Sequence, residues 1–138
     1  MSDMSHPRMY DDADPVLNRV RGIALALPGA AEKVTHGRPT FFTKKVFSYY
    51  GGSVKQPGGY ANHVQHPQAV LFVPEEGERP ALLLDPRCFV PAYLGPFGWL
   101  GLDVHEDGDF AEIAELIEVS YRLTAGRRLI AELDARSG

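Results

Sequence analysis

The sequence predicts an α+β fold in two layers, in which an antiparallel β-sheet carries helices on one face. Apolar residues recur at helical spacing near both ends of the chain, and consecutive short strand patterns with turn residues fill the middle. Strands that follow one another in this way favour antiparallel pairing, with the helices covering one face. The 138 residues fit a single domain, placed at residues 14–138, and residues 1–13 are expected to form a flexible tail.

The first helix is expected to begin at Asp14-Pro15. Aspartate is a favoured N-cap, and proline at the first helical position loses no hydrogen bond. Pro28-Gly29 ends this helix. Its apolar stripe is expected to face the core and consists of Val16, Val20, Ile23 and Leu27.

A β-hairpin is predicted next, with strands over residues 40–43 and 46–50 and with Lys44 and Lys45 at its tip. The segment before it, residues 32–37, alternates only weakly and is expected to lead into a turn. Because neighbouring side chains of a strand face opposite ways, some aromatic residues should enter the core while others face outward. We expect Phe41 and Phe47 inside, and Phe42, Tyr49 or Tyr50 outside.

The second half of the chain continues with short elements. Residues 51–68 are expected to form a loop or a ragged hairpin, and a strand, a short helix, two strands and a helix pair should follow. Asp107 or Asp109 should cap the first helix of that pair. The expected ranges are 69–74, 79–84, 89–92, 99–104, about 110–123 and 127–136. The turn before the last strand holds Gly95 and Gly98, whose spacing does not match a dinucleotide fingerprint.

Charge is distributed unevenly along the chain. The net charge is −4, but residues 33–74 contain five Lys or Arg and no acid, so this segment carries +5. Residues 1–32 sum to −2 and residues 75–138 to −7. A basic face on an acidic body can steer an anion, although the acidic total disfavours a general coat for nucleic acid.

In this basic segment cations and aromatic residues interleave, a composition typical of single-stranded nucleic-acid binding, where cations follow phosphates and rings stack on bases. A nucleotide or another planar anion would suit it equally. The alternative is that the rings pack a sheet and the lysines keep an edge soluble. Tyr60 belongs to this aromatic set, and Tyr93 and Trp99 join the site only if the hairpin folds next to them. The candidate binding residues are His36, Arg38, Lys44, Lys45, Tyr49, Lys55, Tyr93 and Trp99.

No combination of residues predicts catalysis or a metal. His63 and His66 lack a third and a fourth ligand nearby, and Asp103, His105 and Asp107 alternate at a strand end without a nucleophile. We therefore assign no catalytic residues, no metal site and no cofactor, and favour a protein that is not an enzyme.

Cellular context follows from composition. No apolar run is long enough for a membrane span, and the first residues do not resemble a secretory signal, so we expect a cytoplasmic protein without a membrane partner. The single cysteine, Cys88, has apolar neighbours and is expected to be a buried, inert thiol.

Several short motifs occur in a fixed order over roughly residues 14–135. They are Leu27-Pro28-Gly29, Gly37-Arg38-Pro39-Thr40-Phe41, Val46-Phe47, Pro91-Ala-Tyr-Leu-Gly, Gly98-Trp99-Leu-Gly-Leu and Ser120-Tyr121-Arg122-Leu123. Together they resemble the MmcQ/YjbR family. The resemblance implies a compact two-layer α+β fold similar to type III secretion chaperones and frataxin-like proteins, with exposed hairpins likened to a double-wing DNA-binding motif. It supplies no catalytic residues, and the DNA-binding label rests on analogy of fold.

Three hypotheses about function follow. The first is a binding protein whose basic, aromatic hairpin engages nucleic acid or a nucleotide-like anion, as a monomer or weak homodimer. The second is a protein-interaction module whose exposed strands receive a partner strand. The third is an enzyme acting on a small anion near His36, Arg38 and Trp99, which requires a pocket at that place.

Overall fold

The computed structural model describes residues 8–59 and 62–137, in which six strands form one sheet. The strand order is β1-β2-β3-β4-β6-β5, and all neighbouring strands are antiparallel. This sheet, together with four α-helices, confirms the predicted α+β class. The strands are β1 (Ala31–Thr35), β2 (Arg38–Phe42), β3 (Val46–Val54), β4 (Val64–Phe72), β5 (Cys88–Phe89) and β6 (Leu100–Asp103).

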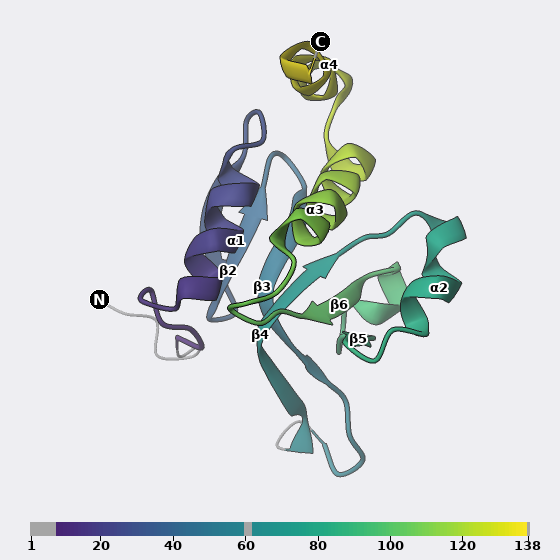
Figure 1. Cartoon of the computed structure of the whole chain (residues 1–138). Coiled ribbons are helices and arrows are strands. Elements are labelled where there is room, and N and C mark those ends of the chain that lie inside the picture. The colour runs from purple at the N-terminus through teal and green to yellow at the C-terminus, as the bar shows by residue number, and fades with distance from the viewer. Residues whose placement is uncertain (1–7, 60–61, 138) are drawn as a thin grey trace.

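The two longer core helices, α1 and α3, lie side by side on one face of the sheet (Figure 1). Asp14 caps α1 as predicted, because its side chain accepts a hydrogen bond from the Val16 N–H group, and Asp109 caps α3. Helix α2 lies beside β5 (Figure 1). Helix α4 reaches the turn after α1, where the Arg136 side chain donates a hydrogen bond to the Ala26 carbonyl. The helices are α1 (Pro15–Leu25), α2 (Arg79–Leu83), α3 (Phe110–Thr124) and α4 (Arg127–Ser137), with short 3-10 turns η2 (Glu76–Glu78) and η3 (Gly95–Phe97).

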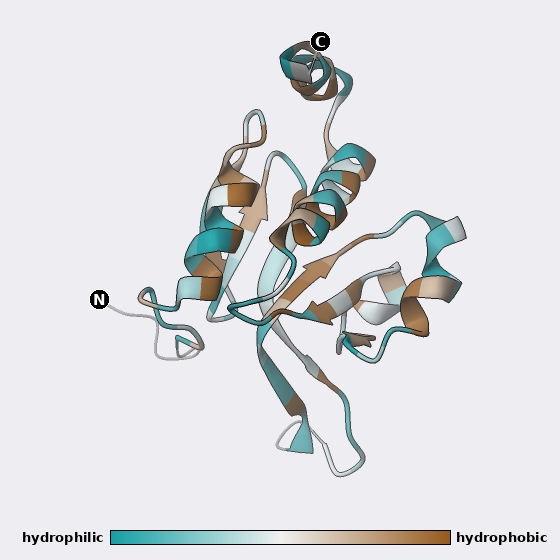
Figure 2. Ribbon diagram, viewed as in Figure 1, coloured by the Kyte–Doolittle hydropathy of each residue, from teal (hydrophilic) through white to brown (hydrophobic). Residues whose placement is uncertain are grey.

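The core lies between the sheet and the helices, and brown, apolar residues gather there in Figure 2. The rings of Phe47 and Tyr121 meet edge to face with centroids 5.3 Å apart. The buried Ser120 hydroxyl donates to the Phe47 carbonyl at 2.6 Å and accepts from the Val73 N–H group at 2.9 Å. Helix α3 is therefore fixed to the sheet by packing and by satisfied polar groups.

A β-bulge changes which residues of β3 face the core. Phe41 pairs with Ser48, but Phe42 pairs with Val46, so Phe47 is the extra residue of β3. Phe47 and Tyr50 consequently both reach the helix side. Tyr50 had been a candidate for an outward position, but it is only 1% exposed and its hydroxyl donates to Asp14 at 2.6 Å.

The first strand of the sheet, β1, was not predicted from the sequence. The apolar and polar residues of 32–37 alternate only weakly, and a turn alone was expected there. Strand β1 has charged and exposed residues, and it forms because every one of its five positions pairs with β2. The segment expected as a tail also contacts the domain where it is described: the Met9 N–H group donates to the Gly37 carbonyl at 2.9 Å.

The β3–β4 hairpin projects beyond the rest of the sheet, and its projecting arm is mostly hydrophilic (Figures 1 and 2). Its pairing is irregular between Tyr50 and Gly52, which agrees with the ragged hairpin predicted over residues 51–68. Tyr60, one of the aromatic residues of the basic segment, lies outside the described residues. Within residues 8–59 and 62–137, no helix has the length and apolar character needed to cross a membrane.

Candidate functional site

The candidate site lies on the outer face of the sheet, the face opposite α1 and α3. Directly paired strand residues share a face, so Thr40, Tyr49, Leu71 and Gly101 mark this side. A long connection, residues 90–99, crosses it, and we call it the cover segment. It is attached where the Ala92 N–H group donates to the Ser53 carbonyl at 2.7 Å.

The cover segment packs on the centre of the outer face through Trp99. The Trp99 and Tyr49 ring centroids are 5.2 Å apart, and Trp99 is only 9% exposed. Burial raises the pKa of the Tyr49 hydroxyl. Tyr49 and Trp99 therefore lie together, which is the condition on which Trp99 was included among the candidate binding residues. Their contact attaches the cover segment to the sheet.

A second predicted pair meets on the projecting hairpin. The Lys55 ammonium lies 5.1 Å from the centroid of the Tyr93 ring, and the His63 imidazole stacks on the same ring at 5.9 Å. Tyr93 is 55% exposed, and its φ of 66° is unusual for a residue with a side chain. The fold thus holds an aromatic ring at the surface beside a cation.

Arg38 connects strands on the two sides of β3. Its guanidinium donates to the Gln65 side-chain carbonyl of β4 and lies over Gly51. A Cβ atom at Gly51 would collide with this guanidinium, so the glycine lets the arginine cross the strand. Arg38 thus links β2 to β4 at the base of the β3–β4 hairpin.

The other predicted cations lie apart from this group. Lys44 and Lys45 are exposed in the β2–β3 turn, at the opposite end of β3 from Lys55. The nine residues of β3 separate these cations by roughly 30 Å at the usual rise per strand residue. His36 lies in the β1–β2 turn with a positive φ of 52°. The eight predicted residues therefore form a band along the sheet and not a single cluster.

One pair of a cation and an aromatic ring was not predicted from the sequence. The Lys33 ammonium of β1 lies 4.6 Å from the centroid of the Phe42 ring of β2. Lys33 and Phe42 could have been linked only by recognising β1 as a strand, because its pairing with β2 places Lys33 directly opposite Thr40 and diagonal to Phe42.

Acidic groups from elsewhere reach the basic segment. Asp103 pairs with His66, with Nδ1 and Oδ1 2.8 Å apart, and the His66 ring stacks on Phe89 at 3.9 Å. Asp103 thus contacts His66 of β4 and does not form a site with His105 and Asp107. Among the residues that the structure describes, no group of three or more His, Cys, Asp or Glu could hold a metal ion.

Cys88, predicted to be buried, is half-buried in β5. Its burial is the largest cause of a raised pKa of its thiol, with the nearby Asp85 carboxylate acting in the same direction. A raised pKa keeps the sulfur protonated, in agreement with an inert thiol.

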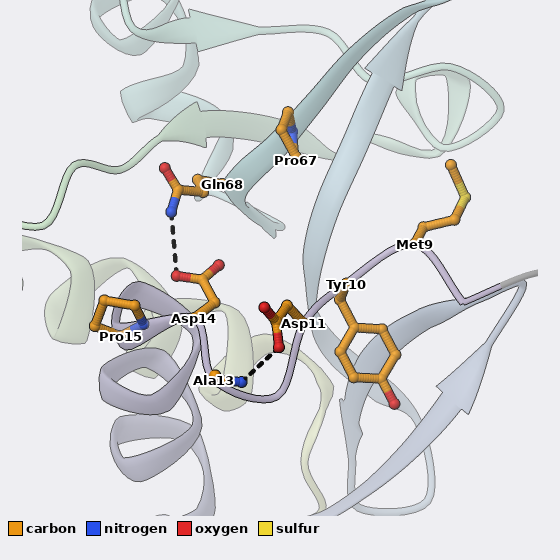
Figure 3. A pocket seen from close by; sticks show the side chains of 8 residues that line it. All are labelled: Met9, Tyr10, Asp11, Ala13, Asp14, Pro15, Pro67 and Gln68. Atoms are coloured by element: carbon orange, nitrogen blue, oxygen red, sulfur yellow. Dashed lines mark hydrogen bonds between the residues drawn. The ribbon is translucent and has the colours of Figure 1, made fainter.

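An open hollow of about 550 Å³ lies where the chain enters α1, between residues 9–15 and β4. Figure 3 shows Asp14 accepting a hydrogen bond from Gln68 beside it, and Asp11 accepting one from the Ala13 N–H group. Two carboxylates at this hollow disfavour an anion. A second hollow, of about 250 Å³, lies beside α2, and among the described residues no Lys, Arg or His lines either one. Neither provides the pocket that the enzyme hypothesis needs at His36, Arg38 and Trp99.

Comparison with known proteins gives a family and no individual relative. The sequence model of the YjbR family matches residues 25–123, which is more than two thirds of the chain and includes the whole sheet. No curated protein and no solved structure matches the chain.

Proposed function

The chain belongs to the YjbR family, and we propose that it binds single-stranded nucleic acid along the outer face of its sheet. The observation that carries the proposal is the placement of two lysines of the acid-free segment 33–74 on aromatic rings, Lys33 on Phe42 and Lys55 on Tyr93. Cations beside rings are the combination that binds phosphates and bases together.

The length of the band favours a polymer over a single nucleotide. A nucleic-acid strand in duplex geometry carries a phosphate every 3.4 Å or so, and β3 alone spans roughly 30 Å. Lys44 and Lys45 lie at one end of this length and Lys55 at the other. A mononucleotide could contact only one of these ends, and the described residues that line the two hollows include no cation to hold its phosphates.

The exposed ring of Tyr93 favours a single strand. Bases can stack on a ring only when they are unpaired or splayed out, and the Tyr93 ring is held at the surface by Lys55 and His63. The lysines make the binding free energy depend on salt concentration, because each contact with a phosphate releases counterions.

Fluorescence anisotropy with a labelled single strand of about 20 nucleotides tests the proposal at low salt and between about 50 and 200 mM salt. Binding should weaken as salt rises, and should exceed binding to a duplex of the same length. Replacing both hairpin-tip lysines, Lys44→Glu with Lys45→Glu, should abolish binding while the far-ultraviolet circular dichroism stays unchanged. Competition with a mononucleotide and with polyphosphate separates base stacking from charge alone.

The matched control is Arg127→Glu with Arg128→Glu. These arginines are exposed in the first turn of α4, outside the basic segment, and the double variant changes the net charge by the same amount. It should retain most of the binding. Wild-type protein that shows no salt-sensitive binding to DNA or RNA contradicts the proposal, and equal losses in the two double variants contradict the assigned location.

A second candidate function is acceptance of a partner strand by β1. This strand lies at the edge of the sheet, where β2 is its single strand neighbour among the described residues, and Val34 is 54% exposed. An open edge can bind an extended peptide through backbone hydrogen bonds. A proline at Val34 should then reduce partner capture in a pull-down. A protein that sediments as a monomer and captures no partner would count against this candidate.

A further inference from the structure

The hollow beside α2 has an apolar floor and an acidic rim. It lies between α3 and the segment that runs from the end of β4 to α2 (Figure 1), and its volume is about 250 Å³. Glu75 and Glu78 are exposed at its edge. The apolar lining is formed by Phe72, Pro74, Leu82, Leu116 and Val119. A volume of this size is below the range of drug-sized pockets and suits one large apolar side chain.

Two acids of α3 already have partners, unlike the two rim glutamates. Glu112 of α3 receives a hydrogen bond from Arg87 at 2.9 Å, and Glu118 pairs with Arg122 at 3.2 Å. Within residues 8–59 and 62–137, by contrast, no ion pair or side-chain hydrogen bond reaches Glu75 or Glu78. Both carboxylates therefore keep their charge available to a second molecule.

Two arginines that are close to the rim glutamates in the sequence, Arg79 and Arg87, have partners elsewhere. Arg79 follows Glu78 directly but donates to the Gly98 carbonyl at 2.8 Å, and so holds the cover segment. Arg87 lies between Asp85 and Glu112, and the hydrogen bonds that its side chain and backbone donate to Asp85 lower the pKa of that carboxyl to about 2. Neither of these two arginines therefore neutralises Glu75 or Glu78 at the rim of the hollow.

We propose that this hollow binds an amphipathic, basic helix of a partner protein. One apolar side chain of the helix would fill the hollow, and Lys or Arg residues one turn away would pair with Glu75 and Glu78. Helices dock in grooves through apolar residues spaced three or four apart, and complementary charge steers the encounter. Charge complementarity selects a basic partner over an acidic one, and the apolar floor selects an amphipathic segment over a purely basic one.

The test uses model peptides of about 15 residues, long enough for four helical turns. One carries Leu at helical spacing with Lys elsewhere, a second has Glu in place of Lys, and a third has Ser in place of Leu. Amide chemical shifts of the isotope-labelled full chain report the site. The first peptide should shift residues 72–82 and 116–119, and the other two should bind at least tenfold more weakly.

Variants of the chain locate the interaction. Glu75→Gln with Glu78→Gln should weaken binding of the first peptide about tenfold, and Val119→Phe, which fills the hollow, should remove the shifts. Glu106→Gln with Glu132→Gln is the matched control, because both acids are exposed and neither lines the hollow. Equal weakening by the control, equal binding of the acidic peptide, or shifts outside the hollow would overturn the proposal.

A second copy of the chain is the main competing occupant, since its Lys44–Lys45 tip is basic. Sedimentation of the free protein decides between them: a dimer that dissociates in the Glu75→Gln, Glu78→Gln variant would overturn the proposal of a separate partner. Nucleic-acid binding is independent of this outcome, because Lys44→Glu with Lys45→Glu should leave peptide binding unchanged.

Discussion

The two faces of the sheet are covered in different ways. On the inner face, α1 and α3 bury a continuous apolar core, and even the polar Ser120 has two backbone partners. On the outer face a single irregular connection, the cover segment, lies across the strands and packs through Trp99. Lys33 lies over Phe42 beside it, and Lys55 lies over Tyr93 of the cover segment itself. We therefore expect the inner face to contribute most of the stability of the fold and the proposed ligand to contact the outer face.

Three glycines of this region have separate structural reasons. A Cβ atom at Gly101 of β6 would collide with the Phe89 ring of the neighbouring β5, so this glycine lets the ring lie against the sheet. A Cβ atom at Gly95 would collide with Val90, so this glycine lets the cover segment fold back on its own first residue. Gly98 has a φ of 92°, in the left-handed region that favours glycine.

The largest expected effect comes from the inner face. Phe47→Ala removes a fully buried ring that contacts Tyr121 across the sheet–helix interface. Buried Phe→Ala substitutions cost about 3–5 kcal/mol, because the transfer free energy is lost and a cavity remains. Urea unfolding followed by circular dichroism measures this change. A loss below about 1 kcal/mol would show that the inner face is not the main source of stability.

A smaller effect on stability is expected from the outer face. Trp99→Ala removes the anchor of the cover segment, but its ring packs on the half-buried Tyr49 under an irregular connection that can relax into the space left. We expect a loss of about 2–3 kcal/mol in urea unfolding. Nucleic-acid binding should also weaken, because the cover segment carries Tyr93. A Trp99→Ala protein as destabilised as Phe47→Ala would remove the distinction between the faces.

The parts of the fold that sequence predicted are those set by neighbouring residues. Asp14-Pro15 specifies a helix start by itself, and Lys44-Lys45 between two aromatic strands specifies a turn. The outward or inward position of Tyr50 was not predictable in this way. It depends on a bulge at Phe47, and strict alternation fails wherever one strand gains a residue.

Contacts between residues far apart in the sequence were also not predicted. β1 contains charged residues and is held by its partner strand, so local propensity gives little sign of it. The same limit applies to the candidate site. The uneven charge of the sequence located a basic segment, but it did not predict the side-chain hydrogen bonds between Arg38 and Gln65 or between Asp103 and His66. The nominated Lys55 and Tyr93 do meet, through a connection that returns almost forty residues later.

Tyr50 allows a pH test of the inner face. Burial, and then the hydrogen bond to Asp14, raise the pKa of its hydroxyl above the ordinary value near 10. The folded state therefore resists deprotonation, so this contribution to stability is present below pH 10 and is lost as the pH rises above it. Tyr50→Phe should cost about 1–2 kcal/mol at pH 7 and should lose less stability above pH 10 than the wild type. Parallel curves of unfolding free energy against pH would contradict this assignment.

The smallest effect on stability, and the sharpest test of the outer face, is expected for Lys33→Met. Methionine keeps a chain of similar length over the Phe42 ring but removes the charge, and an exposed cation–π contact contributes only about 0.5–1 kcal/mol. If Lys33 contacts a phosphate, the slope of log affinity against log salt should fall by about 0.7, the value for one contact with a single strand. Lys33→Arg should restore the slope because it restores the charge. An unchanged slope with reduced stability would mean that the Lys33–Phe42 pair belongs to the sheet edge and not to the binding surface.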